Sequence, residues 1–227
     1  MQKNITKTTD VTLDQNEVGS VIPKEYISAN ELLEKSFQLA SNVYRSGFYP
    51  TWILAIWRGG TPVGMAIQEY FKYRDIKTDH IAIRTSSYTD IAVQSSHVRV
   101  HGLEYVVKHA NASDRLLIVD DIFDTGRSVQ AVLKKLQSKM RANLPTTIRI
   151  ATILYKPDNN KTNIQPDFYV ATTDKWVVFP HELEGLSKKE ILDSKGPIIA
   201  DCCETSPNSK DNNNNDDDNA KQIIISD

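Results

Sequence analysis

The stretch at residues 116–136, LLIVDDIFDTGRSVQAVLKKL, constrains the fold of this chain more than any other. It opens with four consecutive apolar residues, Leu116–Val119, which is typical of a parallel strand covered on both faces. Further along, apolar side chains recur at the spacing of one helical face, at Val129, Val132, Leu133, Leu136 and Met140. Asp120, Asp121 and Asp124 lie between the two patterns, so the sequence predicts a strand, an acidic loop and a helix.

The acidic loop is the first candidate for a functional site. In open α/β sheets, ligands bind outside the carboxyl ends of the strands. We expect the three aspartates to project at such an end.

The rest of the chain repeats the alternation of strands and helices. Ser28 with Glu31 predicts a capping box. The helix after it carries Leu33, Phe37, Ala40 and Tyr44 at helical spacing. Strands are predicted at residues 51–57, 80–85, 147–155, 167–172 and 176–179. This alternation favours an α/β fold with a parallel sheet.

Two connections carry their own signals. After the strand at 51–57, Thr61 and Pro62 are predicted as the N-cap and first-turn proline of a second helix. The polar stretch from Ser86 to Asp114 is predicted to be a long loop, which in a compact domain tends to be a functional lid.

Length and composition indicate one domain with polar extensions. A chain of 227 residues, 40% hydrophobic, can bury one sizeable core. We predict a flexible arm at residues 1–24, a catalytic domain at 25–204 and a disordered Asn/Asp-rich tail at 205–227. The apolar runs are strand-sized and no secretory pattern is evident, so we expect a cytoplasmic protein that does not contact membranes.

The distribution of charge argues against nucleic acid as a partner. The net charge is −2, and residues 207–227 contain five Asp against two Lys. The remainder of the chain is therefore close to neutral, whereas nucleic-acid-binding domains usually show a basic face.

The segment VDDIFDTGRS fits three rival classes of structure poorly. A plain turn does not need three carboxylates. A response-regulator receiver would place its acidic pair near the chain start and a phospho-acceptor Asp after a later strand. An aspartic protease has an all-β fold with two such turns, whereas a helical pattern follows this one.

Phosphate and sugar chemistry accounts for the stretch better. In DTGRS a small-residue turn leads into a helix, so backbone N–H groups converge on an anion site. Thr125 and Ser128 add hydroxyl donors. Asp120 and Asp121, just before this turn, suit sugar hydroxyls or a divalent cation. The natural ligand is a sugar phosphate.

This pattern of an apolar run, two acids, two apolar residues and D-T-G-x-[ST] resembles the phosphoribosyl-diphosphate (PRPP) signature of type I phosphoribosyltransferases. The segments IWRGG, TSSY, LYKP and DKWVVFPHE resemble the 6-oxopurine class of that family, over roughly residues 25–192. The resemblance implies a central, mainly parallel sheet flanked by helices with a small hood region.

The resemblance also implies roles at the PRPP site. Arg58, Gly59 and Gly60 resemble the pyrophosphate loop, which contains a non-proline cis peptide, and Ser87 and Tyr88 resemble the tip of a mobile loop. The catalytic carboxylates would be Asp120 and Asp121 at the ribose hydroxyls and Asp124 beside nitrogen 7 of the purine. The implied PRPP-binding residues are Arg58, Gly59, Gly60, Ser87, Tyr88, Asp120, Asp121, Asp124, Thr125, Gly126, Arg127 and Ser128.

For the base, the resemblance implies that Lys156 donates to the 6-oxo group, Trp176 stacks on the purine and the Val177 backbone bonds its edge. For the metal, it implies Mg2+ held by Asp120, Asp121 and Glu182, where the family usually has Asp in place of Glu182.

The implied reaction is purine salvage: PRPP and hypoxanthine or guanine give the nucleoside monophosphate and pyrophosphate. The family forms dimers or tetramers. Two alternatives stay open. One is a preference for xanthine, and the other is a regulatory protein of the same fold that senses PRPP.

Overall fold

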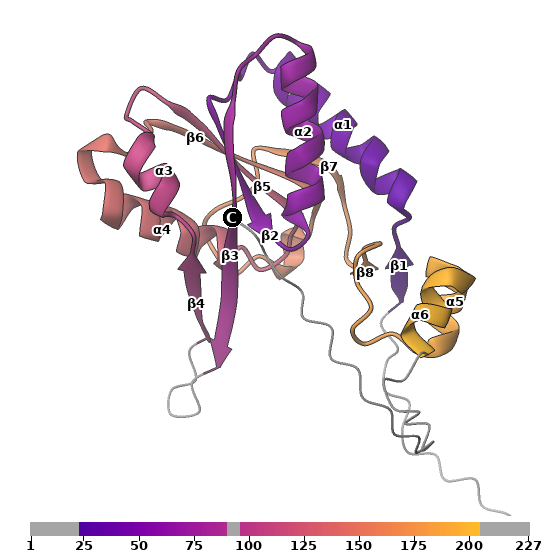
Figure 1. Cartoon of the computed structure of the whole chain (residues 1–227). Coiled ribbons are helices and arrows are strands. Elements are labelled where there is room, and N and C mark those ends of the chain that lie inside the picture. Colours follow the sequence, from indigo (N-terminus) through magenta and orange to yellow (C-terminus); the bar gives the residue numbers. More distant parts are fainter. Residues whose placement is uncertain (1–22, 90–95, 205–227) are drawn as a thin grey trace, which may run out of the picture. The chain divides into compact units, whose positions relative to one another are not determined.

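The structure is a computed structural model that describes residues 23–89 and 96–204, without the side chains of residues 87–89, 96 and 97. The chain divides into two compact units, Met1–Glu182 and Leu183–Asp227. The predicted tail, and the arm apart from Pro23 and Lys24, lie outside the described residues, so the domain boundaries stay predictions. Figure 1 shows the chain coloured along its sequence.

The first unit is built on a six-stranded sheet of order β4-β3-β2-β5-β6-β7. All neighbouring strands are parallel except β3 and β4, which form an antiparallel pair. The strands are β2 (Trp52–Trp57), β3 (Asp79–Thr89), β4 (Ser96–His101), β5 (Arg115–Phe123), β6 (Thr147–Tyr155) and β7 (Phe168–Thr172). The α/β class and the mainly parallel sheet predicted from the sequence are confirmed.

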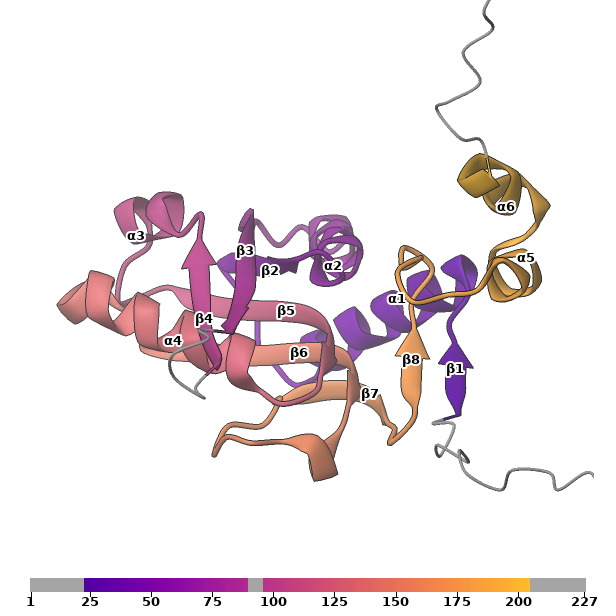
Figure 2. The same cartoon turned by 90° about the horizontal axis from the view of Figure 1, so that it is seen from below.

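Helices cover both faces of this sheet (Figures 1 and 2). One buried cluster joins Ile53, Leu117 and Val119 of the sheet to α1 and α2, and the other joins Leu54 and Ile118 to α3 and α4. Successive strand residues point to opposite faces, so the continuous apolar runs supply both clusters. The helices are α1 (Ala29–Arg45), α2 (Gly60–Tyr73), α3 (Glu104–His109) and α4 (Arg127–Met140).

A separate two-stranded parallel sheet pairs β1 (Lys24–Tyr26) with β8 (Trp176–Val178). It corresponds to the predicted hood region, and Val177 packs into the cluster that also holds α1. Two short 3-10 turns, η1 (Arg141–Asn143) and η2 (Pro157–Asn159), follow α4 and β6.

The second unit contains α5 (Lys188–Lys195) and α6 (Pro197–Glu204). α5 begins with a capping box in which Ser187 and Glu190 exchange hydrogen bonds. Within the described residues, no helix is long and apolar enough to cross a membrane.

The predicted face of α1 is correct in the second half of the helix, where Ala40 is buried and Tyr44 packs against the core, and wrong by one residue in the first half. Leu33 and Phe37 are exposed, while Leu32, Ser36 and Val43 are buried against the sheet. Ser36 can be buried because its hydroxyl donates to the carbonyl of Leu32 at 2.6 Å. Because the polar residue Ser36 lies on the buried face, the apolar spacing of the sequence did not identify that face correctly.

Two predicted connections also differ. The N-cap of α2 is Gly59 rather than Thr61, so the helix begins within the Arg-Gly-Gly segment. The stretch 86–114 is not a single loop, because β3 runs on to Thr89 and is followed by β4 and α3. β3 and β4 form an antiparallel pair at the sheet edge, where burial does not demand apolar residues, so the polar residues of this stretch did not mark a loop.

The acidic segment starts inside a strand, not after it. β5 extends to Phe123, with Asp120 opposite Thr152 and Ile122 opposite Leu154 of β6. The prediction that this strand ends at Val119 was wrong, because Asp120 and Asp121 were interpreted as the start of a loop. Only Asp124 lies in the loop that joins β5 to α4.

Candidate active site

The centre of the site is the pair of neighbouring carboxylates near the carboxyl end of β5. Asp121 is 8% exposed, and its Oδ1 accepts a hydrogen bond from the Ile122 backbone N–H at 2.8 Å. The Asp121 N–H donates to Asp120 Oδ1 at 3.1 Å. Both carboxylates are therefore held by the backbone of their own strand.

The environment of Asp120 destabilises its negative charge. Burial raises the pKa of Asp120 well above its ordinary value, and the negative charge of Asp121 raises it further. A positive group nearby, such as a metal cation or a cationic sugar, would stabilise the negative charge of these two adjacent carboxylates.

The Arg58-Gly59-Gly60 segment lies directly against this pair. A Cβ added at Gly59 would stand 1.6 Å from Asp121 Oδ2, and one added at Gly60 would stand 2.5 Å from the Val119 carbonyl oxygen. Only glycine lets the two segments approach so closely. A cis peptide bond joins Trp57 to Arg58 at the start of the segment.

The DTGRS segment forms the turn between β5 and α4, next to the two carboxylates. Gly126 has φ +76°, a left-handed conformation that glycine adopts without steric cost, and α4 begins at the next residue. Residues 120–126, 128 and 129 line a cavity of about 210 Å3. The first N–H groups of α4 have no partners within the helix, so this cavity offers donors to an anion.

Hydrogen bonds from the segment after β6 hold the loop. The backbone N–H groups of Lys156 and Lys161 donate to the carbonyls of Phe123 and Thr125 at 2.9 and 3.0 Å. Asp124 Oδ1 accepts from Asn159 Nδ2 at 3.0 Å. The carboxylate of Asp124 is therefore oriented by a side chain from the neighbouring connection.

The predicted purine-binding residues come from two elements. Lys156 directly follows β6 and is half-buried. Trp176 and Val177 belong to β8, where the Trp176 side chain is 55% exposed and Val177 is buried. An exposed indole on a small sheet can stack on a ligand, whereas a core tryptophan cannot.

Two groups of predicted residues are less well defined. Ser87 and Tyr88 pair with Val98 and His97 in the β3–β4 hairpin, and their side chains are not among those described. Arg58 directly follows β2 and Arg127 is the first residue of α4, and both side chains are exposed.

The predicted metal ligands are only partly brought together. Asp120 and Asp121 are adjacent, and their mutual repulsion suits a divalent cation. Glu182 instead accepts from the Phe179 backbone N–H at 3.0 Å. Among residues 23–89 and 96–204 there is no cluster of three or more His, Cys, Asp or Glu side chains that could hold a metal ion. The two aspartates fit a cation, and the structure does not add Glu182 to them.

Sequence reasoning missed His181 and Asn159. His181 Nε2 lies 3.5 Å from Asp121 Oδ2, and its ring stacks on Phe179 with centroids 5.7 Å apart and planes at 10°. His181 stands in the segment DKWVVFPHE, next to Glu182, so the segment itself was a signal. Asn159 had no signal, because its role depends on how the chain turns after β6.

The fold and these loops define a phosphoribosyltransferase. The chain belongs to that family, because the model of the phosphoribosyl transferase domain matches residues 24–187. Members of the family generally use Mg2+ with PRPP.

Within the family, the chain is similar to purine enzymes. It is 31% identical over 159 residues to the hypoxanthine-guanine phosphoribosyltransferase of Lactococcus lactis, covering 69% of this chain and 79% of the relative. Two solved structures share the fold. The purine phosphoribosyltransferase of Pyrococcus horikoshii has a TM-score of 0.58 at 24% identity, covering 72% of this chain and 97% of that one. The xanthine-guanine-hypoxanthine phosphoribosyltransferase of Helicobacter pylori has a TM-score of 0.57 at 21% identity, covering 71% and 96%.

Proposed function

We propose that this protein is a purine-salvage phosphoribosyltransferase that converts PRPP and hypoxanthine or guanine to IMP or GMP and pyrophosphate. The observation that carries the proposal is the packing of Gly59 and Gly60 against the β5 aspartates, beside the cavity at DTGRS. In the proposed reading, these segments are a diphosphate loop, a ribose site and a 5′-phosphate site. The similarity to the Lactococcus enzyme supports the class of base.

The residues at the ribose would act mainly by position and charge. The 5′-phosphate sits at the N-terminus of α4, with Thr125 and Ser128 as further donors. Asp120 and Asp121 accept hydrogen bonds from the ribose hydroxyls and stabilise the cationic sugar as the bond to pyrophosphate breaks. Asp124, held by Asn159, accepts the proton that leaves the purine near nitrogen 7.

The diphosphate leaves toward the Arg58-Gly59-Gly60 segment, whose N–H groups and guanidinium offset its charge. Mg2+ bound beside Asp120 and Asp121 would supply positive charge to the diphosphate oxygens. Ser87 and Tyr88 would cover the site from the β3–β4 hairpin and exclude water.

Base selection would rest on the residues after β6 and on β8. Lys156 donates to a 6-oxo group, and it would face a donor in adenine, whose 6-amino group cannot accept. Trp176 stacks on the base, and the Val177 backbone bonds its edge. A preference for xanthine and a PRPP-sensing role are not favoured, because the curated relatives are named hypoxanthine-guanine phosphoribosyltransferases.

We further propose a homodimer or homotetramer in the cytoplasm, where its substrates PRPP and free purines would be found. Size-exclusion chromatography with light scattering measures the assembly, and cell fractionation measures the location. A monomer, or recovery in another compartment, would contradict this part.

The testing experiment incubates purified protein with PRPP and Mg2+ and follows four bases separately by ultraviolet absorbance. Conversion of hypoxanthine or guanine, but not adenine, is the expected result. Xanthine as the preferred base would assign the enzyme to the alternative specificity. PRPP binding without conversion of any base would favour the regulatory role.

A further inference from the structure

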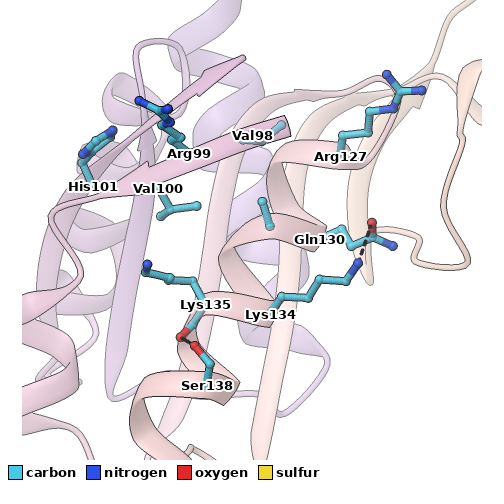
Figure 3. Close-up of a pocket in the computed structure, with 10 residues that line it drawn as sticks. Val98, Arg99, Val100, His101, Arg127, Gln130, Lys134, Lys135 and Ser138 are labelled. Atoms are coloured by element: carbon cyan, nitrogen blue, oxygen red, sulfur yellow. Dashed lines mark hydrogen bonds between the residues drawn. The ribbon is translucent and has the colours of Figure 1, made fainter. Parts of the chain in front are cut away.

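A groove lies between β4 and α4, and none of its lining residues is shared with the cavity at the β5 aspartates. Its volume is about 790 Å3, and ten described residues line it. Along β4, Val98 and Val100 alternate with Arg99 and His101, and Val100 packs against the cluster that contains α4 (Figure 3). The valines therefore face α4, and Arg99 and His101 stand along the rim.

The helix side of the groove is a single polar stripe. Gln130, Ala131, Lys134, Lys135 and Ser138 recur at helical spacing beside the buried face of α4. Figure 3 shows Lys135 extending toward β4 and Lys134 running along the helix, where its ammonium lies 3.4 Å from Gln130 Oε1. Two ammonium groups and two neutral polar side chains thus line this wall.

The charge of the groove has one sign. None of its ten described lining residues is acidic, although the chain contains 29 Asp and Glu. The lining includes two Lys, two Arg and one His, and the helix sequence RSVQAVLKKLQSKM contains no carboxylate. In the described part of the chain, no carboxylate lies within ion-pair distance of Lys134 or Lys135. The groove is therefore positively charged, although the chain outside residues 207–227 is close to neutral overall.

The size and spacing of the groove indicate the kind of anion. Pockets of roughly 300–1,000 Å3 suit small molecules. Figure 3 shows the side chains of Lys134 and Lys135 extending in different directions from α4, so their ammonium groups are spread along the groove. Cations spread in this way can contact several phosphates of one chain, which favours a chain of phosphates over a single phosphate. Val98, Val100 and Ala131 add an apolar surface.

We propose that the groove between β4 and α4 binds a ligand that carries a chain of phosphates, either free polyphosphate or the polyphosphate of a nucleotide. Lys134 and Lys135 contact the phosphates, and the apolar floor accepts the nucleoside where one is present. Apart from Arg127, the first residue of α4, none of the groove's lining residues is among those proposed to bind PRPP, and binding in the groove does not depend on the enzyme's activity. Its occupant contacts both the hairpin that carries Ser87 and the helix that begins at Arg127.

The test measures binding by isothermal titration calorimetry with the full-length protein, using ATP and inorganic tripolyphosphate as probes. The variant Lys134→Gln/Lys135→Gln removes two charges from the groove. The matched control, Lys108→Gln/Lys139→Gln, removes two exposed lysines that do not line it. Equal melting temperatures for all three proteins establish that the fold is intact.

We expect the groove variant to bind the probes about tenfold more weakly, because two charge-assisted contacts are lost, and the control to stay within about twofold. If ATP binds more tightly than tripolyphosphate, the apolar surface of the groove binds the nucleoside. If the two probes bind equally tightly, the groove is a polyphosphate site. Equal affinity of the groove variant and the wild type overturns the proposal, as does no binding by the wild type.

A single-stranded oligonucleotide serves as a third probe. If it binds more tightly than ATP and loses affinity in the groove variant, the ligand is nucleic acid and the proposed class is wrong. None of these assays measures turnover. Their results can therefore be interpreted even if the protein does not catalyse the proposed purine-salvage reaction.

Discussion

The substitution Gly59→Ala tests the link between the pyrophosphate segment and Asp121. Gly59 has φ −69° and ψ −28°, a conformation that alanine adopts freely. The added Cβ would nevertheless stand 1.6 Å from Asp121 Oδ2 and 2.1 Å from its Cγ. The variant therefore introduces a steric clash without backbone strain.

The size of the effect follows from this overlap. Ordinary contact begins near 3.4 Å, so the two atoms must separate by about 1.8 Å, which is 3.4 − 1.6. Asp121 is 8% exposed and bonded to the Ile122 N–H, so it cannot move into solvent without losing that bond. Misplacing a reacting group by about 1 Å can cost on the order of 100-fold in rate.

We therefore expect kcat/KM for PRPP to fall by at least about 100-fold, equivalent to about 2.7 kcal/mol of transition-state stabilisation. Overpacking of this kind lowers the free energy of unfolding by about 1–3 kcal/mol. For a chain of this length, that lowers the melting temperature by roughly 2–12 °C.

The assay is initial-rate absorbance with hypoxanthine over a range of PRPP concentrations, with circular dichroism for the melting temperature. The control is Gly47→Ala, where φ is +81° and no atom lies within 4 Å of the new Cβ. It should destabilise the protein by about 1–2 kcal/mol and leave kcat/KM unchanged. Activity of Gly59→Ala within about threefold of wild type would refute the reasoning, because Asp121 would then tolerate displacement.

Four further substitutions test individual side chains. Asp121→Asn should keep the fold and lose most of the rate, so unchanged turnover with normal PRPP dependence would count against the ribose site. Lys156→Gln should weaken discrimination against adenine or abolish oxopurine binding, and an unaltered base profile would sink that role. Trp176→Ala should raise KM for the base by roughly 5- to 150-fold, equivalent to about 1–3 kcal/mol of stacking, with KM for PRPP unchanged; equal changes in both constants would argue against stacking. His181→Ala removes the group 3.5 Å from Asp121 Oδ2 and should lower kcat more than it changes KM for the base, whereas wild-type kcat would show that the contact is incidental.

Local chemistry explains why much of the site could be predicted from the sequence. The signature from Asp120 to Ser128 is continuous in the chain, so its strand, turn and helix lie together whatever the rest of the protein does. Gly126 shows this directly, because its left-handed φ is a property of the turn itself.

Other features depended on parts of the chain that are far apart. The sequence places Gly59 in a loop, but only the pairing of β2 with β5 brings it against Asp121. Asp120 and Asp121 were expected in a loop because aspartate is rare in strands. The strand continues through them because β6 supplies partners as far as Tyr155.

The sequence by itself determined the α/β class, the phosphate-binding turn and the acidic pair, since these follow from periodicity and from residues that are neighbours in the chain. Tertiary structure alone decided that His181 faces Asp121, that Asn159 orients Asp124, and that Val100 and Lys135 line one groove. The physical reason is that contacts between distant segments depend on strand order and helix placement, which the packing of the whole core sets and which no local pattern encodes.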